Sequence, residues 1–386
     1  MAETFELRKF VAPEFVFGVG ARRLAGRYAK NLGGRKVLVV SDPGVVAAGW
    51  TKDVTDSLEA EGLAFALFTG VTPNPKADEI MAGAAVYRAE NCNALIAVGG
   101  GSPIDCAKGI GIVTSNDRNI LLFEGVDMVA VPMPPLICVP TTGGTSADVS
   151  QFVIVSNPLE KVKFAIISKS VVPDLALIDP ETLTTMDSYL TACTGLDALT
   201  HAIEAYVSTA RSAMTDLHAI EAIRLISSNL IPSITNLADL ELRSNIMQGS
   251  LQAGLAFSNA ILGATHAMAH SLGGALDIAH GECNAILLDH VIEFNMPAAP
   301  ERFEHIATAM GLDLRGMTSG QKKSTLLNHV RDLKKATGIV RTLNDLGVSR
   351  GDVNFLTDHA LKDPCMATNP RKVSERDIEV VYEESL

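Results

Sequence analysis

The chain has 386 residues, of which 47% are hydrophobic and 20% are charged. These proportions are typical of an ordinary globular protein and exclude a largely disordered chain. The net charge of −12 at pH 7 would repel a phosphate backbone, so we expect no nucleic-acid partner. The length is sufficient for two domains that each bury a core.

Three features of the sequence predict a cytoplasmic protein with no membrane contact. Residues 1–9 lack the apolar core and the cleavage site of a signal peptide. The six cysteines are scattered without a CxxC pair, which is typical of reduced thiols. Residues 254–276 contain no Asp, Glu, Lys or Arg, but their many Ala, Gly and Ser residues and two histidines favour a helix in a protein core over a membrane span.

The first half of the chain alternates between strand and helix patterns. Short apolar runs bounded by polar turns predict strands, and continuous apolar runs favour a sheet that is covered on both faces. With helices between them, these strands should form β-α-β units with right-handed crossovers and a parallel sheet. In chain order, the predicted strands lie in residues 36–42, 63–68, 94–98, 136–139 and 175–178, and the helices in residues 50–61 and 77–90.

After residue 180 the pattern is helical. We therefore predict an α/β fold class with a parallel sheet in an N-terminal domain, residues 1–184, and an all-helical C-terminal domain, residues 185–386. Because there is no long linker, the two domains should pack closely around a cleft. The predicted helices of the second domain cover residues 195–206, 213–236, 240–259 and 282–294.

Two glycine-rich loops follow predicted strands, GGGS at residues 99–102 and TTGGTS at residues 141–146. Glycine lets the backbone approach a ligand closely, and the free N–H groups of a helix start can bind a diphosphate. We expect Ser102 to cap the helix after the first loop, with Pro103 as its first residue and Asp105 as its capping-box partner. Two such loops in one sheet favour a nucleotide site, although glycine-rich turns also serve only to turn a chain.

Asp42 ends the first predicted strand. An acidic side chain there can accept hydrogen bonds from a ribose diol and repel a 2′-phosphate, which favours NAD over NADP. In the common dinucleotide fingerprint the acid follows the glycine loop, whereas here it precedes it. The alternative is an aspartate that forms a turn before Pro43 and Gly44.

Residues 263–281 hold three of the nine histidines. His266 and His270 are four residues apart and would share one face of a helix. His280 follows a Gly-Gly break, where the chain can bend back towards that face. Three imidazoles in an apolar segment indicate a divalent metal, and the alternative is two core histidines with one loop histidine.

Asp197 and His201 are also four residues apart in a helical pattern, so both side chains can point at one ion. With His266 and His280 they would supply one carboxylate and three imidazoles and leave room for a substrate oxygen. For Asp197 alone, a helical ion pair or an acid near a helix N-terminus is the alternative.

Several motifs in this order resemble those of the iron-containing alcohol dehydrogenases, and together they cover nearly the whole chain. The resemblance implies an NAD(P)-binding α/β domain, a helical domain and a divalent metal in the cleft between them. The motifs are GGGSPID at 99–105, TTGGT at 141–145, GLDALTHAIEAY at 195–206, HAMAHSLGG at 266–274, HG at 280–281, HALKDPC at 359–365 and TNPR at 368–371.

The resemblance also implies roles for individual residues. Iron is the expected metal, with zinc as the alternative, because the ligand types alone do not separate the two. His270 matches a histidine close to nicotinamide and substrate, Phe152 and Phe257 match positions of the substrate pocket, and a homo-oligomer is expected. The metal positions are Asp197, His201, His266 and His280, and the cofactor positions are Asp42, Asn74, Gly99, Gly100, Gly101, Ser102, Asp105, Thr141, Thr142, Thr145 and Lys163.

We therefore expect an enzyme that transfers a hydride between NAD(H) and a short primary alcohol or diol, or the corresponding aldehyde. Two alternatives were weighed. A lyase similar to dehydroquinate synthase would use NAD and a metal but would need a pocket rich in Lys and Arg, and residues 254–281 contain neither. A non-catalytic assembly protein has no evident need for both a nicotinamide site and an open metal position.

Overall fold

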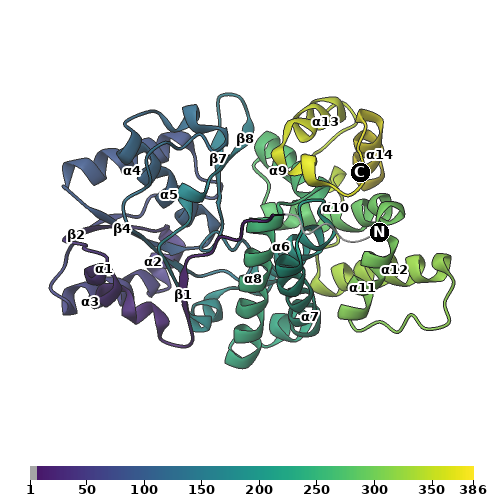
Figure 1. Cartoon of the computed structure of the whole chain (residues 1–386), viewed down its shortest axis with the longest axis horizontal. Coiled ribbons are helices and arrows are strands. Elements are labelled where there is room, and N and C mark those ends of the chain that lie inside the picture. The colour runs from purple at the N-terminus through teal and green to yellow at the C-terminus, as the bar shows by residue number, and fades with distance from the viewer. Residues whose placement is uncertain (1–6) are drawn as a thin grey trace.

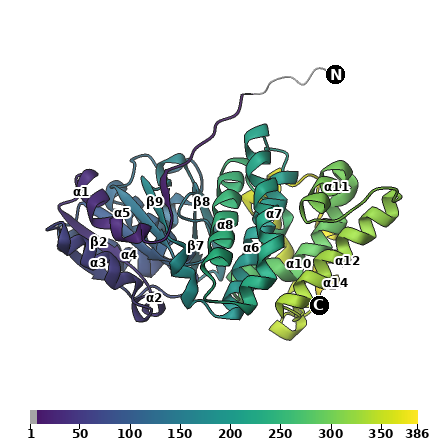
Figure 2. The same ribbon diagram turned by 90° about the horizontal axis from the view of Figure 1, so that it is seen from below.

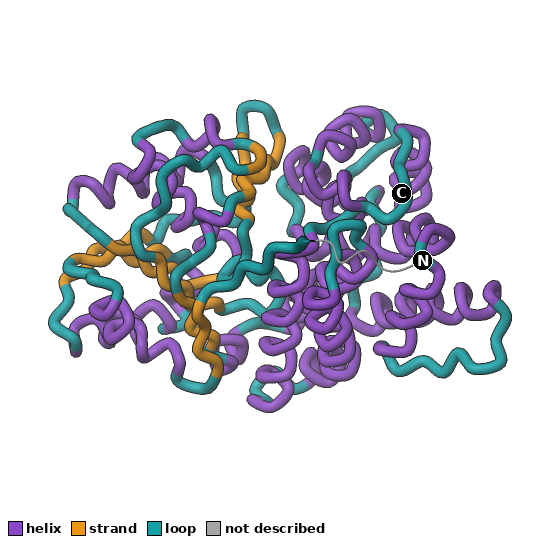
Figure 3. The backbone as a smooth tube through the Cα atoms, in the orientation of Figure 1, coloured by secondary structure: helices purple, strands orange, loops and turns teal. Residues whose placement is uncertain are grey.

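The structure is a computed structural model that describes residues 7–386. The molecule consists of two halves (Figure 1). The first half contains two β-sheets with helices around them, and the second half is built from helices, as Figure 1 and Figure 3 show. This architecture confirms the predicted fold class. The prediction that no signal peptide is present rests largely on residues 1–6, which lie outside the described residues.

The larger sheet has six parallel strands in the order β1-β9-β6-β4-β2-β3. The four central strands are almost completely buried, as their continuous apolar sequences predict. All five predicted strands form within one or two residues of the expected ends, and the short edge strand β1 was not predicted. The strands are β1 (Glu14–Phe17), β2 (Lys36–Val40), β3 (Ala64–Phe68), β4 (Ala94–Gly99), β6 (Leu136–Pro140) and β9 (Leu175–Ile178).

Helices cover both faces of this sheet because alternate strand residues point to opposite sides. Val37 and Val39 of β2 face the core beneath α1 (Ala25–Asn31) and α3 (Trp50–Ala60). Leu38 and Val40 face the core beneath α4 and α5. Helices α2 (Pro43–Ala47), α4 (Ala77–Ala89) and α5 (Gly101–Asn116) complete the first half.

The strand order reverses beside β2. From β2 the chain crosses to β3 on one side and then returns to β4 on the other. In open parallel sheets a ligand binds at such a switch point, outside the carboxyl ends of the strands. Both Asp42, which follows β2, and the glycine loop, which follows β4, lie at this point.

A second sheet was not predicted. It consists of β5 (Gly125–Val126), β8 (Val162–Ile167) and β7 (Phe152–Asn157), and β7 and β8 form an antiparallel pair. The expectation of parallel topology was made for the five predicted strands and holds for them, whereas the antiparallel pair β7–β8 was not predicted. Strand β8 contacts α9 of the helical half, so the hairpin connects the two halves (Figure 1).

In the helical half, α6, α7 and α8 pack side by side next to the sheets, and Figure 2 shows them between the sheets and the remaining helices. The predicted helical segment at residues 254–276 is in fact split, because α8 ends at Ala260 and Ile261 has a positive φ of 60°. The helices are α6 (Ser188–Val207), α7 (Ala213–Thr235), α8 (Leu240–Ala260), α9 (Ala264–Leu276), α10 (His280–Asn295), α11 (Pro300–Ala309), α12 (Ser319–Thr337), α13 (Val353–Lys362) and α14 (Glu375–Ser385).

Two further findings bear on the sequence predictions. Each of the six cysteines is a buried free thiol. Among residues 7–386, no helix combines the length and the apolar character that crossing a membrane requires.

Candidate active site

The first glycine loop starts α5 differently from the prediction. Gly100 is the N-cap and Gly101 the first helical residue, and no side chain caps the helix. Ser102 Oγ instead accepts a hydrogen bond from the Asn74 amide at 3.1 Å, and Asp105 Oδ2 accepts one from the Ile154 amide at 3.2 Å. The predicted capping box is therefore wrong, because Ser102 and Asp105 bind neighbouring segments and the amides at the helix start stay free for a ligand.

The two glycine loops lie against each other. A Cβ atom at Gly100 would lie 2.9 Å from Thr142 Cγ2, and one at Gly101 would lie 3.0 Å from Thr145 Cγ2. Only glycine allows this approach without displacing the threonines. The predicted positions Gly99 and Thr141, whose amide donates to the Gly99 carbonyl at 3.0 Å, hold the loops in register.

Two buried polar atoms in this cradle have no hydrogen-bond partner within residues 7–386. They are Asp105 Oδ1 and Thr142 Oγ1. Burial raises the pKa of Asp105 to about 6, with Lys108 opposing the rise. Because unpaired buried polar atoms are costly, their presence beside free helix amides fits a polar ligand such as a dinucleotide.

Asp42 is the N-cap of α2. Its Oδ1 atom accepts a hydrogen bond from Val45 N at 2.9 Å. The turn-forming contact, which was the alternative for this residue, is therefore present. A carboxylate has a second oxygen, so this cap leaves Asp42 Oδ2 free for a ribose hydroxyl.

Asn74, Lys163 and Asp277 form a chain of hydrogen bonds between the halves. Lys163 Nζ, on β8, donates to Asn74 Oδ1 at 2.7 Å, and Asn74 Nδ2 donates to Asp277 Oδ1 at 2.6 Å. Burial lowers the pKa of Lys163. Two predicted cofactor positions thus meet at the cleft, together with an aspartate that the sequence analysis did not select.

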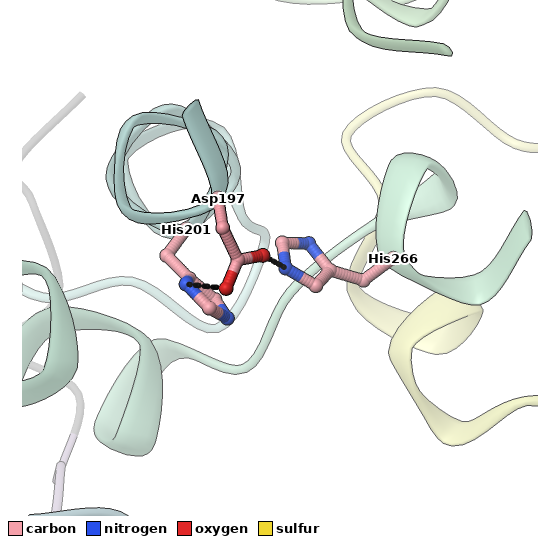
Figure 4. A group of neighbouring side chains, drawn as sticks. All are labelled: Asp197, His201 and His266. Carbon is pink, nitrogen blue, oxygen red and sulfur yellow. Dashed lines mark ion pairs between the residues drawn. The ribbon is translucent and has the colours of Figure 1, made fainter. Parts of the chain in front are cut away.

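The predicted metal residues gather from three helices. Asp197 and His201 lie on α6 and His266 on α9, and ligand atoms from the three lie within 4.8 Å of one another (Figure 4). Asp197 is 3.9 Å from His201 Nδ1 and 3.9 Å from His266 Nε2. His280, the first residue of α10, brings its Nε2 atom to 3.7 Å from Asp197 Oδ1.

The predicted bend at the Gly-Gly pair before His280 is wrong. Gly273 and Gly274 are inside α9, which ends at Leu276 and is followed by Asp277 with a positive φ of 52°. The glycines are needed for a close approach, because a Cβ atom at Gly273 would lie 2.5 Å from Lys163 Nζ and one at Gly274 would lie 2.6 Å from the Lys163 backbone nitrogen. They bring β8 and its lysine against α9.

The chemistry of this donor set fits a divalent transition metal. Burial lowers the pKa of His201, His266 and His280, so each imidazole is neutral and has a lone pair to offer. His201 Nδ1 and His280 Nδ1 are buried without a hydrogen-bond partner in the described part of the chain. One carboxylate with three imidazoles suits iron(II) or zinc.

The two predicted pocket residues lie beside this group. The Phe257 ring stacks on His201, with centroids 4.3 Å apart, and Phe152 lies 5.7 Å from Phe257. Both phenylalanines are buried. They form an apolar wall that keeps water away from one side of the carboxylate and the imidazoles.

His270 pairs with a carboxylate other than Asp197. Its Nδ1 atom lies 2.8 Å from Asp363 Oδ2, and its ring stacks on His280 with centroids 5.1 Å apart. Burial opposes the ionisation of Asp363, but His270 and the Cys365 amide outweigh it, and the pKa of this carboxyl lies below its usual value. A cavity of about 360 Å³ between β8 and α13 reaches both His270 and Asp363, and Lys163 also lines it.

Besides Asp277, three residues that contact the predicted site residues were not predicted from the sequence. Glu204 binds His266 Nδ1 at 2.7 Å, and Asp363 binds His270. Asn284 Nδ2 lies 2.7 Å from Asp197 Oδ1 and 3.2 Å from the Nε2 atoms of two of the histidines. A helical signal existed for two of them, since Glu204 is three residues after His201 and Asn284 is four after His280.

The fold and the site together define a metal-dependent dehydrogenase class, with a dinucleotide cradle at the carboxyl ends of the sheet strands and a ligand group of nitrogen and oxygen atoms on the helices beside it. Comparisons with known proteins agree. The protein-family model described as "Iron-containing alcohol dehydrogenase" matches residues 12–180. A second family model, "Fe-containing alcohol dehydrogenase family, C-terminal", matches residues 191–386.

The similarity to individual relatives extends over nearly the whole chain. The 1,3-propanediol dehydrogenase of Klebsiella pneumoniae is 40% identical, with 96% of each chain covered. The NAD-dependent methanol dehydrogenase of Bacillus methanolicus is 34% identical over 98% of this chain and 99% of its own. A solved structure of 1,3-propanediol oxidoreductase superimposes with a TM-score of 0.96 at 38% identity, covering 99% of this chain and 100% of that one.

The chain therefore belongs to the iron-containing alcohol dehydrogenase family. It is an NAD-dependent oxidoreductase of alcohols and aldehydes, in a family that uses NAD and iron. Of the three functions weighed from the sequence, the comparisons support the dehydrogenase.

Proposed function

We propose that the enzyme interconverts short primary alcohols or diols and their aldehydes. The observation that carries the proposal is the group formed by Asp197, His201, His266 and His280, which lies under the apolar wall of Phe257 and includes two residues of α6, the helix that packs against the second glycine loop. The relatives named for 1,3-propanediol and methanol support small substrates. An apolar wall beside polar ligand atoms suits a short alkyl chain that ends in a hydroxyl group.

The four residues of that group would hold the metal, with iron(II) as the first choice and zinc as the alternative. A divalent ion there supplies Lewis-acid polarisation of the substrate oxygen. Asp197 provides the negative charge that balances the ion, and Phe257 excludes water on the side of His201.

The two glycine loops and the Asn74–Lys163 pair would hold NAD. Free amides at the start of α5 suit the diphosphate, and Asp42 suits the adenosine ribose. Lys163 Nζ, held by Asn74 at 2.7 Å, lies at the cleft and suits the ribose next to the nicotinamide. The full proposed set is Asp42, Asn74, Gly99, Gly100, Gly101, Ser102, Asp105, Thr141, Thr142, Thr145 and Lys163.

His270 would carry the proton that an alcohol releases when it is oxidised. A carboxylate accepts, so the contact with Asp363 places a hydrogen on His270 Nδ1 and leaves Nε2 free to take a proton. The cavity that reaches His270 and Asp363 provides a route to solvent. Phe152 and Phe257 would line the substrate pocket.

The test is to scan NADH formation with ethanol, 1-butanol, 1,3-propanediol, a 1,2-diol and glycerol, with NAD and NADP side by side. We expect net NADH with short primary alcohols or diols. If NAD is used only transiently, as in a lyase, no net NADH forms with any alcohol, and the proposal is then wrong.

Asp42→Ser separates the cofactor role of this residue from its structural role. Serine keeps the N-cap of α2 but removes the charge that repels a 2′-phosphate. We expect the ratio of kcat/KM for NAD to that for NADP to fall by about tenfold, a typical size for a coupling of about 1.4 kcal/mol. An unchanged ratio in a variant of normal thermal stability would show that Asp42 only caps the helix.

We also propose a cytoplasmic location, a homo-oligomer and a domain boundary. Buried free thiols are typical of a reducing compartment and support a cytoplasmic location. Among residues 7–386 no strand pairs with the outer edge of β1, whose Phe15 and Phe17 are partly exposed, and this supports a homo-oligomer. The change from strands to helices between β9 and α6, which a 3₁₀ helix at Pro180–Thr185 connects, supports a domain boundary between residues 184 and 185.

A further inference from the structure

A buried glutamate lies behind one of the proposed metal ligands. Glu204 is on α6, and its side chain is 4% exposed. Its Oε2 atom accepts hydrogen bonds from His266 Nδ1 at 2.7 Å, from Gly263 N at 2.9 Å and from His266 N at 3.3 Å. Its Oε1 atom accepts one from Thr265 N at 2.7 Å. This carboxylate therefore both caps the start of α9 and contacts the ring that α9 carries.

These contacts determine the protonation of the imidazole. Burial raises the pKa of Glu204, but backbone N–H groups of Gly263, Thr265 and His266 donate to its two oxygens and oppose that rise, so they stabilise the ionised carboxylate, which can only accept. His266 Nδ1 must then carry a hydrogen, and Nε2 must be the nitrogen with the lone pair. Asn284 Nδ2, a donor, lies 3.2 Å from that Nε2 atom, which agrees with this tautomer.

The same contacts determine where the ring points. Glu204 and Asp197 both lie on α6, and their carboxylates lie at opposite nitrogens of the His266 imidazole. Glu204 lies at Nδ1 at 2.7 Å, and Asp197 Oδ1 lies 3.9 Å from Nε2. Since Glu204 also binds three backbone amides at the start of α9 and its N-cap, the position of the ring relative to α6 does not depend on an ion.

We propose that Glu204 is a positioning residue that fixes the tautomer and direction of His266, so that Nε2 faces the metal site before any ion binds. This inference rests on the metal site of the proposed function. A carboxylate on the far nitrogen of a ligand imidazole also makes the imidazole a stronger ligand, and losing such a partner typically weakens metal binding by about 10–100-fold.

Glu204→Gln tests this role because an amide offers one oxygen and one NH₂ group. If the NH₂ group faces His266, Nδ1 must become the acceptor and Nε2 takes the hydrogen, which prevents it from binding a metal. If the NH₂ group faces Thr265 N, the tautomer survives, but the negative charge that strengthens the imidazole is lost. Both orientations weaken the site.

The measurement is the affinity of the metal-free protein for zinc and for cobalt(II), by competition with a chelator, together with the cobalt absorption spectrum. We expect Glu204→Gln to bind at least tenfold more weakly and to give an altered spectrum. The matched control is Asp289→Asn, which removes a buried carboxylate on α10 whose partners are Arg331 and Lys334. We expect its metal affinity to stay within about twofold of the parent, an energy below the usual effect of one hydrogen bond.

A second measurement does not depend on the stability of the variant. Nitrogen NMR of the metal-free parent protein with labelled histidine, assigned with His266→Gln, should show His266 with its hydrogen on Nδ1. A hydrogen on Nε2, or unchanged metal affinity in Glu204→Gln, would overturn the inference. Failure of the parent protein to bind metal would instead overturn the proposed function, so the two outcomes are distinguishable.

Discussion

Asp197→Asn should lower kcat/KM by about 10³-fold or more, because Lewis-acid catalysis contributes several kcal/mol and each 1.36 kcal/mol is a factor of ten in rate. Asp197 is the charged member of the four proposed ligands, and its carboxylate lies within 3.9 Å of all three imidazoles. An amide keeps the volume of the side chain but removes the charge that balances a divalent ion. The measurement is kcat/KM with the best alcohol of the scan, together with the metal content per chain.

A loss of activity through unfolding is separable from a loss of metal. Asp216→Asn on α7 removes a carboxylate that pairs with Arg211 and Arg302, and it should retain both metal and turnover. The metal-free form of Asp197→Asn should unfold at no lower temperature than the metal-free parent, because the substitution relieves a buried charge. An Asp197→Asn protein with full turnover would contradict the ligand assignment.

Removal of the metal gives the same result without a mutation. A strong chelator should abolish turnover by the parent enzyme, and anaerobic addition of iron(II) should restore it more fully than addition of zinc if iron is the working metal. Full activity after complete removal would contradict the metal site as a whole.

Local patterns were sufficient to predict much of this molecule. Continuous apolar runs gave the central strands because a strand buried on both faces has no polar positions. The spacing of four between Asp197 and His201 predicted a shared helix face, which α6 provides. The loops after β4 and β6 were found from their glycines, whose role in bringing two loops together is visible in the structure.

The failures have a common physical cause, which is that a local rule was overruled by a distant contact. Ser102 has the sequence position of a helix cap, but its hydroxyl binds Asn74, 28 residues away. Gly273 and Gly274 resemble a helix break, but the approach of Lys163 from β8 is what requires them. The contacts of Glu204 with His266 and of Asp363 with His270 span 62 and 93 residues. No periodicity within one segment contains such information.

Asp363→Asn should lower kcat by about 100-fold, the lower end of what a positioned acid or base contributes, and should leave KM nearly unchanged. Asp363 Oδ1 accepts from the Cys365 amide at 2.8 Å and Oδ2 faces His270 Nδ1 at 2.8 Å. A backbone N–H cannot reverse its role, so the oxygen of asparagine must stay with Cys365. Its NH₂ group then faces Nδ1, which becomes an acceptor, and Nε2 carries a hydrogen and cannot take the proton of the alcohol.

A double-mutant cycle decides whether the two residues act together. If Asp363 acts only through His270, then His270→Ala and the double variant His270→Ala with Asp363→Asn should have the same kcat, because the second change removes nothing further. Asp358→Asn, on the same α13 and paired with Lys362 at the surface, is the matched control and should turn over normally. Independent, multiplying effects would mean that Asp363 serves the structure around Cys365 rather than the proton on His270.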